Sequence, residues 1–427
     1  MTKIIPELLA PAGNFEKLKA ALRFGADAVY FAGKAFGMRS AADNFDDDEL
    51  REACRYTHAL GKKAYLTVNT MPRAHEYAPL RAFLSRVGNP AGDDGIPDAM
   101  IVADLGVMAL IRQLLPHMEI HVSTQAGICS PETALAFAAL GAKRLVLARE
   151  LNMEEIRQIR DALPDDIELE AFVHGSMCVS YSGRCMLSNE LVGRDGNRGM
   201  CAQPCRWNYT LIEEKRPEIP LPIEVNDLGT FIMASKDMCM IEHIPALMES
   251  GIASFKIEGR MKSAYYAAVV CNTYRMAMDA YLADKDGYTY DARWLDELYS
   301  VSHREYCTGY FLDDCRKESH LATTLGYLRE KAYFATALEY DKEELPGGLA
   351  AQTEAGYLAY FGQKNKVSVG ETAELLTPGQ IGKPFMVTEL YDEEGNPIPS
   401  APHPQQRFFA RVPFPVAPGD IIRAGQD

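Results

Sequence analysis

The chain has 427 residues, of which 47% are hydrophobic and 24% are charged, and this composition is typical of a globular protein rather than a disordered or fibrous one. At this length two domains are expected rather than one. The formal net charge of -15 argues against a broad nucleic-acid-binding surface, although it leaves room for a local basic patch.

Neither a targeting segment nor a membrane span is visible in the sequence. The first residues, Met1 to Glu7, lack the charged head, apolar core and small-residue cleavage site of a signal peptide. The longest apolar stretch, residues 99–111, is interrupted by Asp104 and is too short to cross a bilayer. We therefore expect a cytoplasmic protein with no membrane partner.

Short β-rich apolar runs alternate with helix-period segments from the start of the chain. The predicted strands are Glu7–Ala12, Ala28–Ala32, Lys63–Asn69, Ala99–Ala103, Glu119–Ser123, Arg144–Ala148, Ile167–Val173 and Ala253–Glu258. The predicted helices between them include Asn14–Phe24, Asp47–Leu60, Leu105–Leu115, Pro131–Leu140 and Met153–Leu163. Gly25, Gly61 and Gly141 follow three of these helices, as expected where a helix ends and a strand begins. This alternation favours an α/β fold of the (β/α)8 TIM-like barrel type over an open doubly wound sheet.

One connection of this barrel is much longer than the others. About eighty residues separate His174 from Ser254, whereas loops in α/β units usually have roughly 2–6 residues. Long loops in compact domains usually carry function. We therefore assign residues 1–325 to a barrel with a cysteine-bearing insertion at about 174–253.

The pattern changes after the barrel. Helices are predicted from Ser263 to about Leu282 and at Ala292–Tyr299. Short strands then alternate with Pro, Gly and acidic turns, and they are Tyr333–Leu338, Lys366–Val369, Thr372–Leu376 and Phe385–Tyr391. These runs predict a small all-β C-terminal domain at 326–427 with a role in binding or positioning.

Five of the ten cysteines lie in the insertion, at Cys178, Cys185, Cys201, Cys205 and Cys239. Thiol or metal chemistry is the usual role of many cysteines in a cytoplasmic chain. Four thiolates suit an iron–sulfur cluster, and they suit zinc equally well. The alternative is that these five cysteines are small buried side chains without a ligand role. We expect that buried, structural role for Cys54, Cys129 and Cys271, because they lie in apolar segments.

Active sites of such barrels form where the strands end, at the C-terminal face. The polar residues at these ends are Asn69, Asp104, Gln125, Arg149, Glu150, His174, Glu258 and Arg260. Arg149 and Arg260 are candidates to bind a carboxylate with two hydrogen bonds each. His174 and Glu258 are the candidates for proton transfer. The alternative is a ring of Arg–Glu ion pairs that only holds the barrel mouth together.

A basic run crosses the insertion, with aromatic residues between the charges. Its members are Arg184, Arg194, Arg198, Arg206, Lys215 and Arg216, with Tyr181, Trp207 and Tyr209. Such a run can bind and stack an RNA loop. The alternative, which explains the basic run comparably well, is a solvent-exposed face whose positive charges offset the negative charge of a metal cluster.

Several long motifs resemble one known family, the collagenase-like peptidases of unassigned mechanism. They are the segments 170–188 (EAFVHGSMCVSYSGRCMLS), 7–13 (ELLAPAG), 254–263 (SFKIEGRMKS), 302–306 (SHREY) and 401–406 (APHPQQ). Within this family the chain is most similar to the tRNA uridine hydroxylation proteins. That resemblance implies synthesis of 5-hydroxyuridine at the wobble position of tRNA, without molecular oxygen and with prephenate as hydroxyl donor.

The resemblance also implies a cofactor, partners and a set of site residues. A 4Fe-4S cluster is expected on Cys178, Cys185, Cys201 and Cys239, and Cys205 is an extra cysteine that can substitute for one of them. The expected partners are tRNA and prephenate, with a paralogous subunit as a further candidate. Apart from the resemblance, the strand ends and the basic run supply the expected substrate-binding residues, which are Asn69, Gln125, Tyr181, Arg184 and Arg206.

Three other functions stay open on the sequence alone. One is peptide hydrolysis, although the chain has no His-Glu-x-x-His or Gly-x-Ser-x-Gly motif and a Cys178–His174 pair is its best candidate for a nucleophile and base. Another is hydroxylation of a different RNA or of a quinone precursor. The third is a non-catalytic RNA-binding or assembly protein with a structural cluster.

Overall fold

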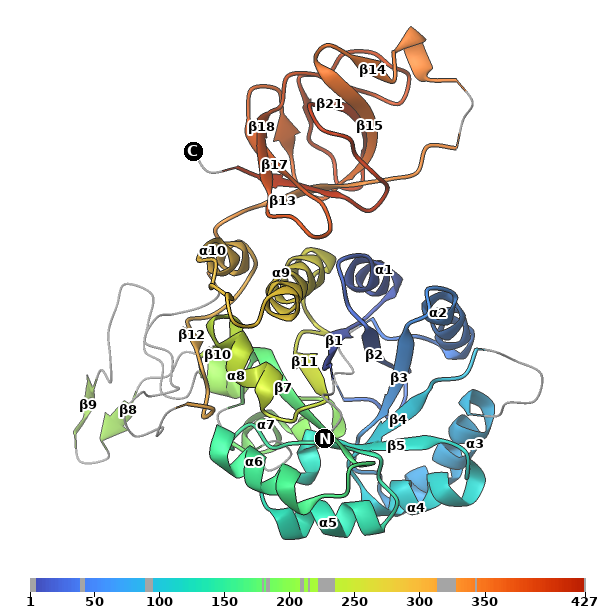
Figure 1. Cartoon of the computed structure of the whole chain (residues 1–427), viewed down its shortest axis with the longest axis vertical. Coiled ribbons are helices and arrows are strands. Elements are labelled where there is room, and N and C mark those ends of the chain that lie inside the picture. The colour runs from blue at the N-terminus through green and yellow to red at the C-terminus, as the bar shows by residue number, and fades with distance from the viewer. Residues whose placement is uncertain are drawn as a thin grey trace.

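A computed structural model of the chain describes residues 5–38, 43–88, 95–178, 180–181, 185–207, 211–213, 216–221, 235–312, 328–341 and 344–425. It has two domains, an α/β barrel and a smaller all-β domain that lies over three helices of the barrel (Figure 1). The predicted boundary between residues 325 and 326 falls outside the described residues. No described helix is both long enough and apolar enough to span a membrane.

The barrel is closed by eight parallel strands. They are β1 (Glu7–Pro11), β2 (Ala28–Ala32), β3 (Lys63–Val68), β4 (Ala99–Val102), β5 (Glu119–Val122), β6 (Arg144–Val146), β7 (Glu168–Ser176) and β11 (Ser254–Ile257). The strands pair in chain order, and β11 pairs with both β7 and β1. This closure confirms the predicted TIM-like fold.

The helices cover the outside of the barrel and begin and end at local sequence signals. They are α1 (Phe15–Arg23), α2 (Asp47–Ala59), α3 (Tyr77–Val87), α4 (Leu105–Leu114), α5 (Pro131–Ala139), α6 (Met153–Ala162), α8 (Ile244–Glu249), α9 (Ala264–Ala283) and α10 (Arg293–Tyr299). Asp46 and Asn152 begin α2 and α6 with reciprocal capping boxes. Gly25 and Gly141 follow α1 and α5 with φ of 105° and 91°, which a residue with a Cβ adopts only at a cost.

The insertion follows β7 and returns to the barrel sheet. It contains α7 (Leu187–Val192), the 3-10 turn η4 (Pro204–Arg206) and a hairpin of β8 (Leu211–Glu213) and β9 (Arg216–Leu221). Its last strand, β10 (Asp237–Cys239), pairs antiparallel with β7, and β12 (Tyr306–Cys307) pairs with β10. Neither pairing was predicted from the sequence. The helix α8 then completes the crossover from β7 to β11.

The C-terminal domain is an antiparallel β structure, as predicted. Its longer strands are β13 (Tyr333–Ala337), β15 (Gly356–Gln363), β17 (Thr372–Leu376), β18 (Lys383–Met386), β21 (Arg407–Val412) and β22 (Ile421–Ala424), and short ones include β19 (Leu390–Tyr391). The predicted strand Phe385–Tyr391 is therefore wrong, because β18 pairs with β17 while β19 pairs with β21 at the other edge of the sheet.

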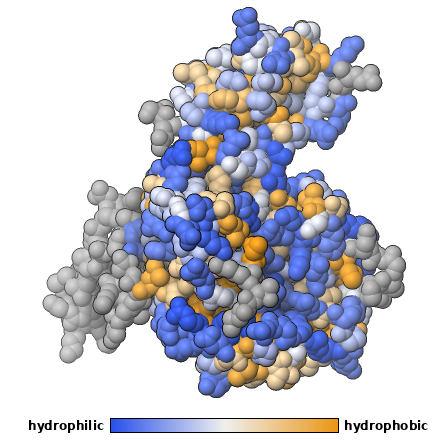
Figure 2. Space-filling model, viewed as in Figure 1, coloured by the Kyte–Doolittle hydropathy of each residue, from blue (hydrophilic) through white to orange (hydrophobic). Residues whose placement is uncertain are grey.

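Buried hydrogen bonds hold the two domains together. Arg423, which is fully buried, lies 2.6 Å from Glu297 of α10 and 2.7 Å from Glu374 of β17. Asn272 of α9 donates to the carbonyl oxygen of Gln380 over 2.8 Å. The surface seen in Figure 2 is mainly hydrophilic on both domains, with scattered hydrophobic residues. The barrel and the β domain therefore form one packed unit.

Candidate functional site

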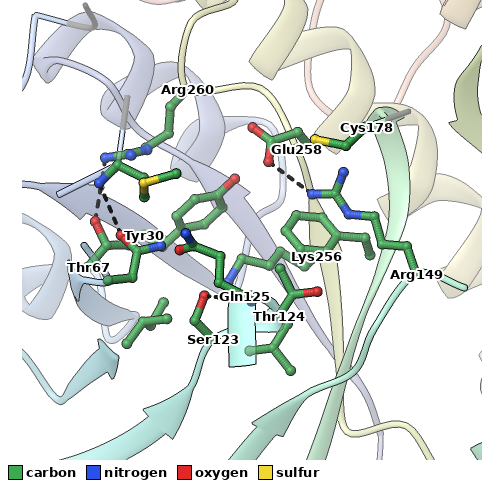
Figure 3. A pocket seen from close by; sticks show the side chains of 15 residues that line it. Tyr30, Thr67, Ser123, Thr124, Gln125, Arg149, Cys178, Lys256, Glu258 and Arg260 are labelled. Carbon is green, nitrogen blue, oxygen red and sulfur yellow. Dashed lines mark hydrogen bonds and ion pairs between the residues drawn. The ribbon is translucent and has the colours of Figure 1, made fainter. Parts of the chain in front are cut away.

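A cavity of about 90 Å³ opens at the C-terminal ends of the barrel strands (Figure 3). We call it the mouth cavity. Six of the predicted site residues line it, namely Asn69, Gln125, Arg149, Cys178, Glu258 and Arg260. Its other polar residues were not predicted from the sequence, and they are Tyr30, Thr67, Ser123, Thr124 and Lys256. The predicted set from the strand ends is thus largely brought together.

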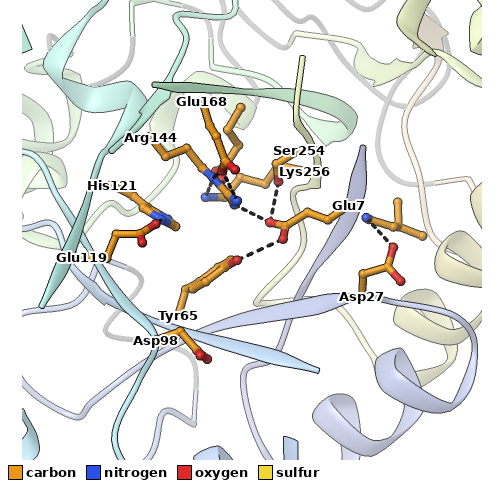
Figure 4. Close-up of polar contacts among 12 residues, drawn as sticks. Glu7, Asp27, Tyr65, Asp98, Glu119, His121, Arg144, Glu168, Ser254 and Lys256 are labelled. Carbon is orange, nitrogen blue, oxygen red and sulfur yellow. Dashed lines mark hydrogen bonds and ion pairs between the residues drawn. The ribbon is translucent and has the colours of Figure 1, made fainter. Parts of the chain in front are cut away.

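Buried charges form the floor of the mouth cavity and the barrel interior below it (Figure 4). Lys256 lies 2.6 Å from Glu170, whose side chain is fully buried, and Arg144 lies 3.4 Å from the same carboxylate. Arg144 also pairs with Glu7 and Glu168. Burial acts to raise the pKa of Glu170, but Lys256 and Arg144 outweigh it and hold the pKa below its usual value.

Arg149 is held in place from three sides at the end of β6. Its Nη1 donates to the carbonyl oxygen of Ser176 over 2.7 Å, and its Nη2 lies 3.2 Å from Glu258. Its guanidinium carbon is 3.8 Å from the centre of the Phe172 ring. The Arg–Glu pair considered as an alternative therefore exists. It fixes a cation and a carboxylate at the edge of the same cavity.

Gln125 is the polar side chain of the mouth cavity with the clearest unmet hydrogen bonds. It lies in η2 (Thr124–Ala126), directly after β5, and is 5% exposed. Neither its Nε2 nor its Oε1 has a hydrogen-bond partner in the described part of the chain. A buried amide without partners is costly. Gln125 therefore presents one donor and one acceptor to a molecule in the cavity.

Two further residues of the cavity are positioned by the structure around them. Asn69 accepts a hydrogen bond from the backbone N–H of Met38 over 3.1 Å. Arg260 is 3% exposed, and its Nη1 lies 3.5 Å from the hydroxyl of Thr67. Arg260 therefore projects a cation into the cavity from the side opposite Arg149 (Figure 3).

His174, the predicted proton-transfer residue, does not reach the mouth cavity. The register between β7 and β11 shifts at this point, so that Phe172 pairs with Lys256 but His174 pairs with Ile257. Such a bulge turns the side chain to the other face of the sheet. His174 packs there against Tyr266 and Tyr274 of α9, and burial lowers its pKa to about 3. It is therefore a neutral, buried side chain outside the cavity.

The predicted cluster ligands differ in how much of each side chain is exposed. Cys178 and Cys201 are exposed, Cys185 and the extra Cys205 are half-buried, and Cys239 is buried at the end of β10. Burial raises the pKa of the Cys239 thiol to about 12. Among the described residues, no three His, Cys, Asp or Glu side chains are close enough to hold one metal ion. A 4Fe-4S cluster is larger than a single metal ion and is held by four thiolates, so the assignment of these cysteines to a cluster stays a prediction.

The remaining predictions have mixed outcomes. Tyr181 is exposed, while Arg184 and the side chain of Arg206 lie outside the described residues. Cys54 and Cys271 are buried as predicted. The prediction for Cys129 is wrong, because it lies in the loop between η2 and α5, where its thiol is exposed and donates to the carbonyl oxygen of Gly127.

Lys256 is the most informative of the missed residues, and a signal for it exists in the sequence. Side chains at i and i+2 of a strand lie on one face. Lys256 is two residues before Glu258, which was predicted to face the mouth. The alternation of β11 therefore predicts that Lys256 points into the barrel, where it is found.

Comparison with known proteins places this geometry in context. The sequence model described as "Peptidase family U32" matches residues 13–321, and the one for the C-terminal domain of that family matches residues 347–423. The chain is 36% identical to "tRNA hydroxylation protein P1" of Bacillus subtilis (strain 168), over 99% of this chain and 95% of that protein. It is 34% identical to "tRNA hydroxylation protein P" of Escherichia coli (strain K12), over 96% and 94%. It is also 34% identical to "Collagenase" of Porphyromonas gingivalis (strain ATCC BAA-308 / W83), over 78% and 80%.

Proposed function

The chain belongs to peptidase family U32, and from that membership we propose that it is an RNA-modifying enzyme that hydroxylates tRNA. The proposed product is 5-hydroxyuridine at the wobble position. The proposed hydroxyl donor is prephenate, and the reaction needs no molecular oxygen. The site of action would be the cytoplasm.

One observation in the mouth cavity carries the proposal, and it is the unpartnered amide of Gln125. Enzymes that modify a base usually recognise it by hydrogen bonds to its Watson–Crick edge. The N3–H of uracil donates and its neighbouring carbonyl oxygen accepts, so one glutamine amide can satisfy both. A cavity of about 150 Å³ holds a benzene ring, whereas the mouth cavity has about 90 Å³. It therefore suits the edge of a base, with the sugar and phosphate outside.

The charged residues of the same cavity suit a carboxylate donor. Arg149 and Arg260 project guanidinium groups from opposite sides, and each can hold a carboxylate by two hydrogen bonds. Glu258 lies beside Arg149 and is the one carboxylate that lines the cavity among the described residues. We assign it the proton transfer that hydroxylation at a ring carbon requires.

Deletion of the gene tests this function directly. We expect 5-hydroxyuridine and its derivatives to disappear from total tRNA, as measured by mass spectrometry of nucleosides. Re-expression of the intact chain is expected to restore them. Unchanged nucleosides in a strain that also lacks any paralogue would contradict the proposal.

We propose further that the insertion binds a 4Fe-4S cluster through Cys178, Cys185, Cys201 and Cys239. The support is chemical, since four thiolates are the ligand set of such a cluster. Bound there, a cluster would supply electron transfer or act as a Lewis acid.

A cysteine exchange tests the cofactor separately from activity. The chain purified without oxygen is expected to contain iron and acid-labile sulfide, and Cys201→Ala is expected to lose most of both. Cys129→Ala is the control, because Cys129 is also exposed but lies outside the insertion. Equal iron in all three proteins, or none in the intact chain, would contradict the assignment.

Peptide hydrolysis, suggested by the family name, has less support in the geometry. A cysteine peptidase needs a base beside its thiol. Cys178 lines the mouth cavity, whereas His174 faces α9, and its Nε2 has no hydrogen-bond partner among the residues that are described. The candidate nucleophile and base therefore do not pair.

A further inference from the structure

A second, larger cavity lies between the barrel mouth and the C-terminal domain. It has a volume of about 680 Å³, and both domains line it. We call it the interdomain cleft. Its barrel side includes Lys17 of α1 and Lys262 before α9, and its C-terminal side includes Arg329 before β13 and Lys364 after β15.

The cleft is basic in a chain that is acidic overall. Of the residues that the structure describes, four Lys and Arg side chains line it against two acidic ones, Glu16 and Glu258, while the whole chain has a net charge of -15. Glu258 pairs with Arg149 at 3.2 Å, and Glu16 pairs with Lys364 at 2.8 Å. Among the described residues, the cations that line the cleft therefore outnumber its carboxylates, and each of these carboxylates already has a cation as its partner.

Two of the cations are held in place by the backbone of the barrel. Lys262 donates to the carbonyl oxygen of Ser302 over 2.8 Å, and Lys17 donates to that of Arg260 over 3.4 Å. Neither acceptor is a carboxylate. Lys17 also lies 4.0 Å from Asp43, whose side chain is 69% exposed, and an exposed ion pair at that distance contributes little. Arg329 is exposed and has no ion pair with any residue in the described ranges.

The amino-terminal end of α9 adds backbone donors to the same cleft. Ser263, which caps this twenty-residue helix, and Ala264, its first residue, both line the cleft. The first N–H groups of a helix have no partner within it, and the helix dipole favours an anion there. The cleft thus combines side-chain cations with a helix end.

The cleft lies next to the mouth cavity. Glu258 lines both, and the two spaces therefore share one wall. An occupant of the cleft can place one group against Gln125, whose amide has no partner in the described structure. A polyanion that carries a planar polar group matches this arrangement, because its charges suit the basic cleft and its polar group suits the amide of Gln125.

We propose that the interdomain cleft binds the phosphodiester backbone of single-stranded RNA and delivers one base to the mouth cavity. This inference rests on the proposed function, because it names where the tRNA lies. Lys17, Lys262, Arg329 and Lys364 contact phosphates, and Gln125 contacts the delivered base. The C-terminal side of the cleft thereby supplies two of these four cations, Arg329 and Lys364.

The test is RNA binding by the full chain, with paired substitutions. Arg329→Gln/Lys364→Gln removes two cations of the cleft. The control Lys143→Gln/Arg157→Gln removes two exposed cations that pair with Asp166 and Glu154 away from the cleft. The probe is unmodified tRNA, and its Kd is measured by fluorescence anisotropy at several salt concentrations. Both double variants must melt at the temperature of the intact chain.

The cleft variant is expected to bind tRNA about 10- to 100-fold more weakly near 0.1 M salt. The slope of log Kd against log salt should fall by about 1.4–1.8, as expected for two lost phosphate contacts. The control variant should match the intact chain. Equal affinity and slope in both double variants would overturn the inference.

Two further outcomes separate this inference from the proposed function. If the cleft variant binds tRNA normally but loses binding of prephenate in a calorimetric titration, the cleft holds the small dicarboxylate and the inference is wrong. If gene deletion removes 5-hydroxyuridine while the cleft variant binds tRNA normally, the function stands and only the cleft assignment fails. Unchanged 5-hydroxyuridine in tRNA after deletion would contradict the proposed tRNA hydroxylation itself.

Discussion

Glu170→Gln is expected to lower the free energy of unfolding by about 3–5 kcal/mol, the usual cost of breaking a buried ion pair. The substitution leaves Lys256 beside a neutral amide at a position where the carboxylate is fully buried. Arg144 loses one partner but keeps Glu7 and Glu168. Urea unfolding followed by circular dichroism measures the difference.

Glu168→Gln is the matched control for this substitution. Glu168 pairs with the same Arg144, but its side chain is 40% exposed, so the expected loss is below about 1 kcal/mol. The double variant Glu170→Leu/Lys256→Met should recover much of the lost stability, because it removes both buried charges. A loss from Glu170→Gln no larger than that from the control would contradict the assignment of the pair.

The same carboxylate predicts a pH dependence with a definite sign. The pKa of Glu170 is lowered in the folded chain, so its contribution is complete above the unfolded pKa of about 4.3. That contribution is lost as the pH falls through the lower folded value. The stability gap between the intact chain and Glu170→Gln should therefore narrow as the pH falls below about 4.3.

Glu258→Gln is expected to lower the rate of tRNA hydroxylation by about 100-fold or more, the usual effect of removing a proton-transfer group. The amide keeps the size of the side chain but can neither take up a proton nor hold the charge that faces Arg149 at 3.2 Å. The rate is measured as the appearance of 5-hydroxyuridine in tRNA after induction of the variant in the deletion strain.

A comparable ion pair far from the mouth provides the control. Glu389 lies 3.4 Å from the buried Arg411 in the C-terminal domain, and Glu389→Gln should leave the rate within about twofold of the intact chain. If Glu258→Gln hydroxylates tRNA as fast as this control, Glu258 has no role in proton transfer. The cavity would then act through its cations and Gln125 alone.

The barrel could be predicted from the sequence because its signals are local. Strand β2 and the start of α5 match their predictions, since apolar runs, capping residues and glycines lie next to the elements that they specify. The β10 pairing could not be predicted, because the three-residue strand returns after a long insertion. The division of Phe385–Tyr391 between two sheet edges likewise depends on contacts distant in sequence.

The site was predictable in part for the same reason. The ends of parallel strands meet at one face, so Asn69, Gln125, Arg149 and Glu258 could be placed together from their positions alone. His174 could not, because the register shift in β7 that turns it outward leaves no mark on the alternation of apolar residues. The burial of Cys239 could not be predicted either, because its hydrogen-bond partner Tyr274 lies in α9, far away in the sequence.

Arg423 limits how far the two domains that line the interdomain cleft can move relative to each other. This cation is shared by Glu297 of the barrel and Glu374 of the β domain, without exposure to solvent. A hinge between the domains would have to open that triad to water, so the spacing between Lys364 and the barrel mouth is set once, when the chain folds. The RNA must then adapt its shape to a fixed distance between the two domains. RNA that bends easily at the target nucleotide is therefore favoured over RNA that does not.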